Sequence, residues 1–146
     1  MSNHDVYMAR ALEQSARQKG RTAENPSVGC VIVKGGKVVG EGVTSDGGRP
    51  HGEANALQVA GTQARGADVY VTLEPCSHYG QTAPCASALI EAGIARCFIA
   101  VIDPDPRVHW RGAALLQEAG IDVQIGLGAE EAFRINSDFF ARVKSS

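Results

Sequence analysis

The sequence of 146 residues contains no apolar run long enough to cross a membrane. Its longest wholly apolar stretch, Cys97 to Ile102, has six residues, far below the ~20 that a spanning helix needs. The amino terminus also lacks the apolar stretch of a secretory signal peptide. We therefore expect a cytoplasmic protein that does not act at a membrane.

An excess of positive charge is missing as well. Fourteen Lys and Arg residues stand against sixteen Asp and Glu residues, a formal net charge of −2, so no net field draws the chain toward nucleic acid. We expect no nucleic-acid partner. Internal repeats, low-complexity tracts and long linkers are also absent from the sequence. With 44% hydrophobic residues, residues 1–146 are expected to form a single domain around one core.

Cysteine is sparse, with four residues in the chain. Without a secretory signal, metal ligands or buried thiols are expected in preference to disulfides. Cys30 and Cys97 lie in strand-like apolar runs and are predicted to be core residues. Cys76 and Cys85 each follow a proline in a polar stretch, so these two are the candidates for chemistry.

The hydrophobic pattern predicts strands alternating with helices. Short β-branched or continuously apolar runs predict strands, and apolar residues at helical spacing predict helices. Such an alternation is typical of a sheet covered on both faces, so the predicted class is α/β with a five-stranded mixed sheet. The expected strands are 28–33, 38–43, 69–73, 97–102 and 121–125, and the expected helices are 6–20, 52–60, 86–93, 112–119 and 129–140.

Four long loops separate these elements and are rich in Gly, Pro and polar residues. Three of them directly follow predicted strands, and in open α/β sheets such loops line the ligand crevice. We therefore expect the chemistry of the protein to lie in these loops. They cover residues 20–27, 44–52, 74–84 and 103–111.

A candidate metal centre combines residues from two of these loops. His51 precedes one predicted helix, and Cys76 and Cys85 bracket the loop that leads into the next. One imidazole and two thiolates form the three-ligand set of a catalytic zinc, although the same donors also accept other thiophilic divalent ions. Glu53, two residues after the histidine, is placed to carry protons without being a ligand.

The order of these residues matches the pattern of zinc-dependent deaminases, His-x-Glu followed by Pro-Cys-x-x-Cys, with one difference. Eight residues separate Cys76 from Cys85, where the pattern has two. Each part alone is unremarkable, because His-x-Glu arises by chance and single cysteines are often buried core residues. A structural zinc site and a site without metal therefore remain alternatives.

Several segments resemble the deaminase domain of the bifunctional riboflavin biosynthesis deaminase/reductase family, and the resemblance extends over nearly the whole chain. The long loop between the two cysteines is its most specific part. The segments that carry the resemblance are 8–12 (MARAL), 25–33 (NPSVGCVIV), 70–80 (YVTLEPCSHYG), 82–85 (TAPC), 103–106 (DPDP) and 119–121 (AGI).

The resemblance implies a three-layer α/β/α cytidine deaminase-like fold, usually oligomeric, and a small-molecule substrate. The implied reaction is hydrolytic removal of the 2-amino group from a diamino-hydroxypyrimidine that carries a phosphoribosylamino substituent. His51, Cys76 and Cys85 would hold zinc, and Glu53 would transfer protons. The implied substrate contacts are Asn25, His78, Gln81, Asp103 and Asp105.

Several of these substrate contacts are equally compatible with a purely structural role. Asn25 precedes a proline and can simply form a turn, and His78 can be a solvated loop residue. Asp103 and Asp105 belong to an Asp-Pro-Asp-Pro stretch whose conformation alone can account for both aspartates.

The chain also departs from the family. Gln81 stands where the family commonly has Lys or Arg, and a neutral amide cannot replace a cation in attracting phosphate. Trp110 occupies a stretch that the family usually fills with small residues; stacking on substrate, an oligomer contact and surface packing are all compatible with it. Thr44 replaces a histidine of some relatives, and Asp105 replaces an asparagine.

These departures weaken the prediction of the substrate more than the prediction of the type of reaction. A phosphate site can still come from Arg49, Arg107 and Arg111 in the predicted loops, although each can equally be a solvated surface residue. One alternative is a deaminase of another amino-substituted heterocycle, such as a purine, a pterin or an unphosphorylated pyrimidine. Another is a non-catalytic zinc-stabilised module, against which Glu53 argues, because a purely structural site needs no carboxylate beside the metal. We expect no reductase domain within residues 1–146.

Overall fold

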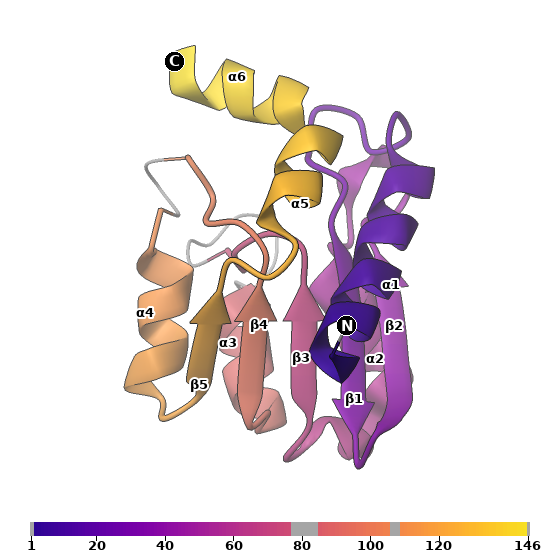
Figure 1. The fold of residues 1–146 in the computed structure, drawn as a ribbon, viewed down its shortest axis with the longest axis vertical. Coiled ribbons are helices and arrows are strands. Elements are labelled where there is room, and N and C mark those ends of the chain that lie inside the picture. The colour runs from indigo at the N-terminus through magenta and orange to yellow at the C-terminus, as the bar shows by residue number, and fades with distance from the viewer. Residues whose placement is uncertain (1, 77–84, 106–108, 146) are drawn as a thin grey trace.

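The sheet is five-stranded and mixed, as predicted. The computed structural model describes residues 2–76, 85–105 and 109–145. Within them the strand order is β2-β1-β3-β4-β5, with β1 antiparallel to both neighbours and β3, β4 and β5 parallel (Figure 1). The strands are β1 (Gly29–Lys34), β2 (Lys37–Val43), β3 (Asp68–Val71), β4 (Arg96–Ile99) and β5 (Asp122–Ile125).

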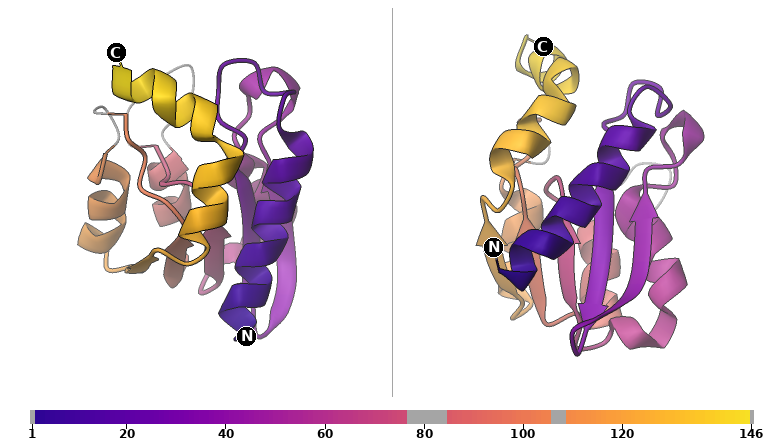
Figure 2. Two further views of the ribbon diagram at one scale, coloured as in Figure 1. Left: turned by 45° about the horizontal axis from the view of Figure 1, so that its top comes forward. Right: turned by 45° about the vertical axis from the view of Figure 1, so that its right-hand side comes forward.

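Helices cover both faces of this sheet, which makes a three-layer α/β/α arrangement (Figures 1 and 2). Helices α1 and α5 pack on one face, and α2, α3 and α4 pack on the other. The helices are α1 (Asn3–Gln18), α2 (Gly52–Ala60), α3 (Cys85–Ala92), α4 (Arg111–Glu118), α5 (Ala129–Ile135) and α6 (Ser137–Ser145), with two 3₁₀ turns, η1 (Asp46–Gly48) and η2 (Gly61–Ala64).

Local sequence explains most of these elements. Helix α1 starts at a capping box in which the Ser2 side chain accepts from the Asp5 backbone and the Asp5 carboxylate accepts from the Ser2 backbone. The β1–β2 hairpin turns at Gly35 and Gly36, which both have positive φ, as a tight hairpin turn requires. In the described part of the chain, no helix has the length and hydrophobicity to cross a bilayer.

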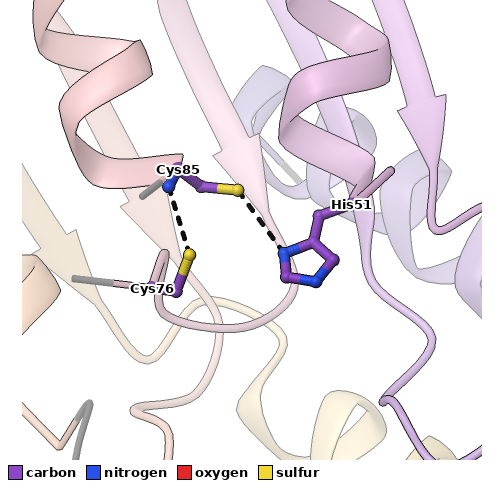
Figure 3. A group of neighbouring side chains, drawn as sticks. All are labelled: His51, Cys76 and Cys85. Atoms are coloured by element: carbon purple, nitrogen blue, oxygen red, sulfur yellow. Dashed lines mark hydrogen bonds between the residues drawn. The ribbon is translucent and has the colours of Figure 1, made fainter. Parts of the chain in front are cut away.

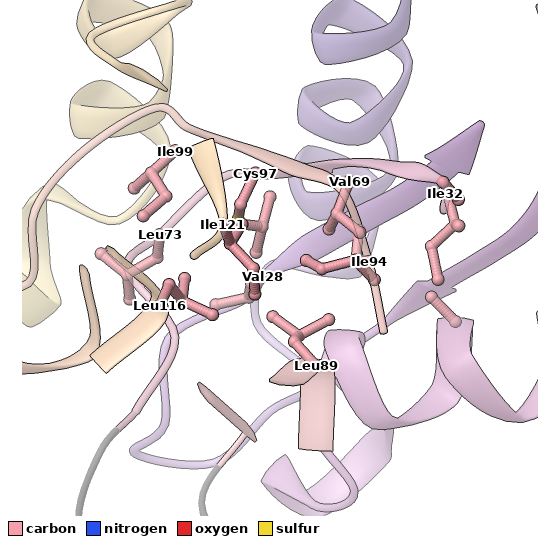
Figure 4. Close-up of a cluster of buried hydrophobic side chains, with 14 of the residues drawn as sticks. Val28, Ile32, Val69, Leu73, Leu89, Ile94, Cys97, Ile99, Leu116 and Ile121 are labelled. Atoms are coloured by element: carbon pink, nitrogen blue, oxygen red, sulfur yellow. The ribbon is translucent and has the colours of Figure 1, made fainter. Parts of the chain in front are cut away.

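Two buried clusters hold the layers together. The larger one lies between the sheet and helices α2, α3 and α4, and Figure 4 shows its centre, where Cys97 and Val69 of the sheet approach Leu89 of α3. The smaller one packs Met8 and Leu12 of α1 against the opposite face. Because both faces of β1, β3 and β4 are covered, these strands are apolar except for one charged residue at an end of each.

The strand directions bring the four long loops to one edge of the sheet. Since β2 and β3 both run opposite to β1, and β4 and β5 run with β3, the carboxyl ends of β2 to β5 lie at the same edge. The amino end of β1 lies there too. The loops after β2, β3 and β4 and the loop before β1 therefore meet, as expected for an open α/β sheet.

The predicted final helix over 129–140 is wrong in one respect, because the chain forms two helices that meet at Asn136. This residue leaves helical geometry, with φ −111° and ψ 30°. Its side chain is buried and binds the Ser27 backbone twice: Ser27 N–H donates to Oδ1 at 3.0 Å, and Nδ2 donates to the Ser27 carbonyl at 2.8 Å. The break therefore anchors α5 and α6 to the loop before β1.

Replacing Asn136 by Ala is expected to destabilise the protein by about 1–3 kcal/mol, because the buried Ser27 N–H and carbonyl would lose their partner. Urea unfolding monitored by circular dichroism measures the difference. The exposed Asn3, in the first turn of α1, provides the matched control Asn3→Ala. An Asn136→Ala protein within about 0.5 kcal/mol of wild type, the usual range for surface substitutions, would show that this pairing does not anchor the helices.

Candidate metal centre and active site

Three donor side chains, one from the loop after β2 and two that flank the loop after β3, converge at the carboxyl edge of the sheet. A ring nitrogen of His51 and the Sγ atoms of Cys76 and Cys85 all lie within 4.8 Å of one another, and Figure 3 shows them facing a common point. Cys85 Sγ is 3.6 Å from His51 Nδ1. The structure thus brings together the three residues that the sequence suggested as metal ligands.

Helix starts position two of these three residues. His51 is the N-cap of α2 and Cys85 is the first residue of α3. The Cys85 backbone N–H donates to Cys76 Sγ at 3.1 Å. A helix amino terminus carries partial positive charge and free N–H groups, so this arrangement favours a thiolate at Cys76.

Close packing holds α2 at this edge. A Cβ atom added at Gly42 of β2 would lie 2.4 Å from the backbone nitrogen of Ala56, and one added at Gly40 would lie 2.5 Å from the Ala56 carbonyl oxygen. Any side chain there would push the helix away from the strand. The two glycines therefore fix the distance between α2, which carries the site residues, and the sheet.

The donor set fits a thiophilic divalent ion such as zinc. Ligands bound tetrahedrally at ordinary zinc distances, about 2.3 Å for sulfur and 2.0–2.1 Å for nitrogen, lie about 3.5–3.8 Å from one another. The Cys85 to His51 separation of 3.6 Å falls in this range. Three protein donors leave one position of a tetrahedron for water or substrate, as in catalytic zinc sites.

The two thiols differ in their proton affinity. A hydrogen bond from Cys85 lowers the pKa of Cys76 to about 4. The same hydrogen bond and burial raise the pKa of Cys85. The sequence predicts two thiolates in the metal-bound site, and in the metal-free protein these shifts favour the thiolate at Cys76 and the thiol at Cys85. A hydrogen bond with Cys76 also raises the pKa of His51.

Glu53 lies in the first turn of α2 and is only 3% exposed. Its Oε1 atom is fully buried and, among the described residues, has no hydrogen-bond partner. Burial raises the Glu53 pKa to about 7, with further contributions from the negative charges of Cys76 and Asp103. A carboxyl group with this pKa can both accept and donate a proton near neutral pH.

Asn25 belongs to the loop before β1, and its side-chain Nδ2 donates to the carbonyl of Gly48 at 2.9 Å. This bond joins the loop before β1 to the loop that leads into His51. Asn25 is half-buried, so the structure places it at the same edge as the three donors. Arg49, from the second of these loops, is exposed, as is Arg111 at the start of α4.

Asp103 and Asp105 follow β4 and are both buried. The Asp105 N–H donates to Asp103 Oδ1 at 2.9 Å, which is the local turn that the Asp-Pro-Asp-Pro stretch also allowed. Burial raises the Asp103 pKa to about 6. The charge of Asp103 acts on Glu53, and that of Cys76 acts on Asp103, so Asp103 borders the metal centre.

Three of the predicted residues, His78, Gln81 and Arg107, lie outside the described residues. Their suggested roles stay predictions.

Sequence reasoning gave no role to Glu74, although it stands directly between the predicted strand 69–73 and Pro75. The structure shows its carboxylate buried and accepting hydrogen bonds from the backbone N–H groups of Asp103, Trp110 and Ala113. The available signal was an acidic residue that directly follows a buried strand, where an ionised side chain needs partners.

Purified protein is expected to bind one zinc ion per chain, and Cys76→Ser and Cys85→Ser are each expected to lose most of it, because each removes one of three donors. Metal content after dialysis, measured by mass spectrometry, tests this. Cys97→Ala is the matched control, since Cys97 is fully buried in the core. Full zinc content in both serine variants would contradict the assignment of these ligands.

The raised pKa of Glu53 also predicts that the stability of the zinc-free protein depends on pH. Its pKa is about 7 when folded, against 4.5 for the free side chain. From pH 4.5 to 7 the unfolded chain releases this proton while the folded protein keeps it, so stability is lost as the pH rises. The loss is about 3 kcal/mol by linkage.

Urea unfolding of chelator-treated wild type and Glu53→Gln between pH 4.5 and 8 measures this loss. Glutamine cannot ionise, so the variant should gain stability relative to wild type across this interval. Two curves that run parallel would show that Glu53 does not bind its proton more tightly when the protein folds.

Comparison with known proteins gives the family. The sequence model described as "Cytidine and deoxycytidylate deaminase zinc-binding region" matches residues 1–101. The riboflavin biosynthesis protein RibD of Escherichia coli K12 is 52% identical over 141 residues, 97% of this chain but only 38% of that protein. This chain therefore spans less than half the length of that relative.

Two further relatives extend the comparison. The diaminohydroxyphosphoribosylamino-pyrimidine deaminase of Buchnera aphidicola from Acyrthosiphon pisum is 48% identical over 98% of this chain and 97% of that protein. A solved structure of Acinetobacter baumannii RibD superposes with a TM-score of 0.94 at 43% identity, over 98% of this chain and 40% of that chain. By sequence and by fold, the chain belongs to the zinc-binding cytidine and deoxycytidylate deaminase family.

Proposed function

We propose that the chain is a zinc-dependent hydrolytic deaminase of the riboflavin pathway. Its substrate is 2,5-diamino-6-(5-phosphoribosylamino)pyrimidin-4-one, from which it removes the 2-amino group as ammonia. The observation that carries this proposal is the convergence of His51, Cys76 and Cys85 beside the buried Glu53. The names of the Buchnera and Escherichia relatives support the choice of substrate.

In this proposal His51, Cys76 and Cys85 hold the zinc ion. When bound, zinc supplies Lewis acidity that lowers the pKa of a water molecule toward about 7. Two thiolates balance its double positive charge, and the neutral imidazole adds no charge. The pKa of Cys76, lowered to about 4, means that this ligand needs no further deprotonation at neutral pH.

Glu53 carries the protons of the reaction. It takes one proton from the attacking water as the oxygen adds to the ring carbon that bears the amino group. It gives this proton to the adjacent ring nitrogen. It then takes the second proton from the added hydroxyl, which becomes a carbonyl, and passes it to the departing amine, which leaves as ammonia. A pKa of about 7 suits a group that works in turn as base and as acid.

The family resemblance proposes five substrate contacts, of which three are in the described part of the chain. Asn25 and Asp103 lie at the same edge of the sheet as the metal centre, supported by their positions in the loops before β1 and after β4. Asp105 is held by Asp103. His78 and Gln81 stay predictions, as do a requirement for phosphate and assembly into a homo-oligomer.

Glu53→Gln is expected to lower the rate of ammonia release by about 10²–10⁴-fold, the usual contribution of general acid–base catalysis. Zinc content should stay unchanged, because Glu53 is not among the three donors. A coupled assay of ammonia release by zinc-loaded protein measures the rate, with metal analysis of the same sample. Turnover retained by Glu53→Gln would exclude the proton-transfer role.

The same assay distinguishes the substrate alternatives. It compares the phosphoribosylamino pyrimidine, its dephosphorylated form, guanine and cytidine, with Glu53→Gln as the blank. Turnover confined to the phosphorylated pyrimidine establishes the proposed substrate. Turnover of another ring alone would support the zinc-dependent mechanism but show that the substrate is a different heterocycle. No turnover of any ring would favour a non-catalytic zinc module.

A further inference from the structure

The Glu74 carboxylate is a buried anion that binds only backbone groups among the described residues. The side chain is 3% exposed. Oε1 accepts from the N–H groups of Asp103 at 3.2 Å and Trp110 at 3.0 Å, and Oε2 accepts from Ala113 N–H at 3.0 Å. An unpaired buried carboxylate is costly, so these three bonds account for its burial.

The three donors lie at the two ends of one segment. Asp103 lies in the loop after β4, Trp110 is the N-cap of α4, and Ala113 is in the first turn of that helix. One side chain therefore joins the described residues of this segment, 103–105 and 109–110, and caps α4 from outside the helix, where a negative charge is favourable. The His109 N–H, which donates to the Asp105 carbonyl at 2.8 Å, ties the segment internally.

The start of α4 also rests directly on the residue before Cys76. A Cβ atom added at Gly112 would lie 1.9 Å from the carbonyl oxygen of Pro75. The first turn of α4 is thus in backbone contact with the segment that carries a candidate zinc ligand. A shift of α4 would therefore change the position of this first turn relative to the metal centre.

Trp110 itself is held in an unfavourable backbone conformation. Its φ is +65°, in the left-handed region that a bulky residue rarely adopts. Its side chain is 51% exposed and packs edge-on against His109, with ring centroids 6.1 Å apart. The bond from Trp110 N–H to Glu74 fixes the backbone of an exposed aromatic residue beside the site.

We propose that Glu74 is a positioning residue that holds the described residues of this segment, among them Asp103 and Trp110, against Pro75 and Cys76 as one wall of the substrate site. The proposal rests on the proposed function, because it assigns this wall to the deaminase substrate. Glu74 acts through the backbone of the segment and does not itself take part in proton transfer.

The chain contains one tryptophan, so its fluorescence reports on this segment alone. Glu74→Gln keeps the size of the side chain but has a single acceptor oxygen, which cannot serve donors on both sides. We expect a shifted emission maximum and stronger acrylamide quenching of Trp110. Glu131→Gln is the matched control, since Glu131 is on α5 and pairs with the exposed Arg134.

The kinetic readout separates positioning from general structural damage. With zinc content equal to wild type, Glu74→Gln should raise KM roughly tenfold, with a smaller change in kcat, because a displaced wall weakens substrate alignment. Glu74→Asp keeps two acceptor oxygens and should bring both the Trp110 fluorescence and KM part of the way back to the wild-type values. Unchanged Trp110 fluorescence and KM in Glu74→Gln, or a loss of kcat alone with KM unchanged, would overturn the proposal.

A measurement on wild type covers the case in which Glu74→Gln does not fold. Native-state hydrogen exchange should show protected amides at Asp103, Trp110 and Ala113, and unprotected amides there would refute the positioning role. The proposed function and the positioning role of Glu74 can also be disproved independently of each other. If wild type released no ammonia from the pyrimidine, the proposed function would fall, whereas exchange and fluorescence would still decide whether Glu74 holds the segment.

Discussion

The burial of a carboxyl group beside two thiols and an imidazole is the constraint on which the rest of the structure depends. Glu53 is almost fully buried, and its pKa is raised to about 7 by that burial and by the negative charges nearby. Such a cluster is stable only if the negative charges are balanced by protons or by a cation. The starts of α2 and α3, at His51 and Cys85, supply partial positive charge. A zinc ion completes the balance.

The parts of the fold that depend on neighbouring residues could be predicted from the sequence. The helix over Gly52–Ala60 appears with the predicted bounds, because small residues and a closing glycine mark it locally. The hairpin at Gly35 and Gly36 could be predicted for the same reason. So could the positions of the loops at the ends of the strands. The donor residues could be found because imidazole, carboxylate and two thiolates in that order are uncommon apart from metal chemistry.

The parts that could not be predicted depend on side chains that bind distant backbone. Asn136 pairs with Ser27, 109 positions away, and this pairing interrupts a helix that periodicity alone extends to residue 140. Glu74 binds Ala113, 39 positions away, and no periodic pattern encodes such a partner. The opposite pKa shifts of Cys76 and Cys85 likewise depend on spatial contact, which sequence spacing does not give.

The three contacts of Glu74 have an evolutionary consequence. Because its carboxylate binds main-chain N–H groups, every residue except proline at positions 103, 110 and 113 presents the same donor. Side chains in this loop can therefore diversify while its anchor is kept. Gly112 is the exception, since the carbonyl of Pro75 leaves no space for a side chain. Such an anchor is compatible with many loop sequences, because main-chain groups alone supply its donors.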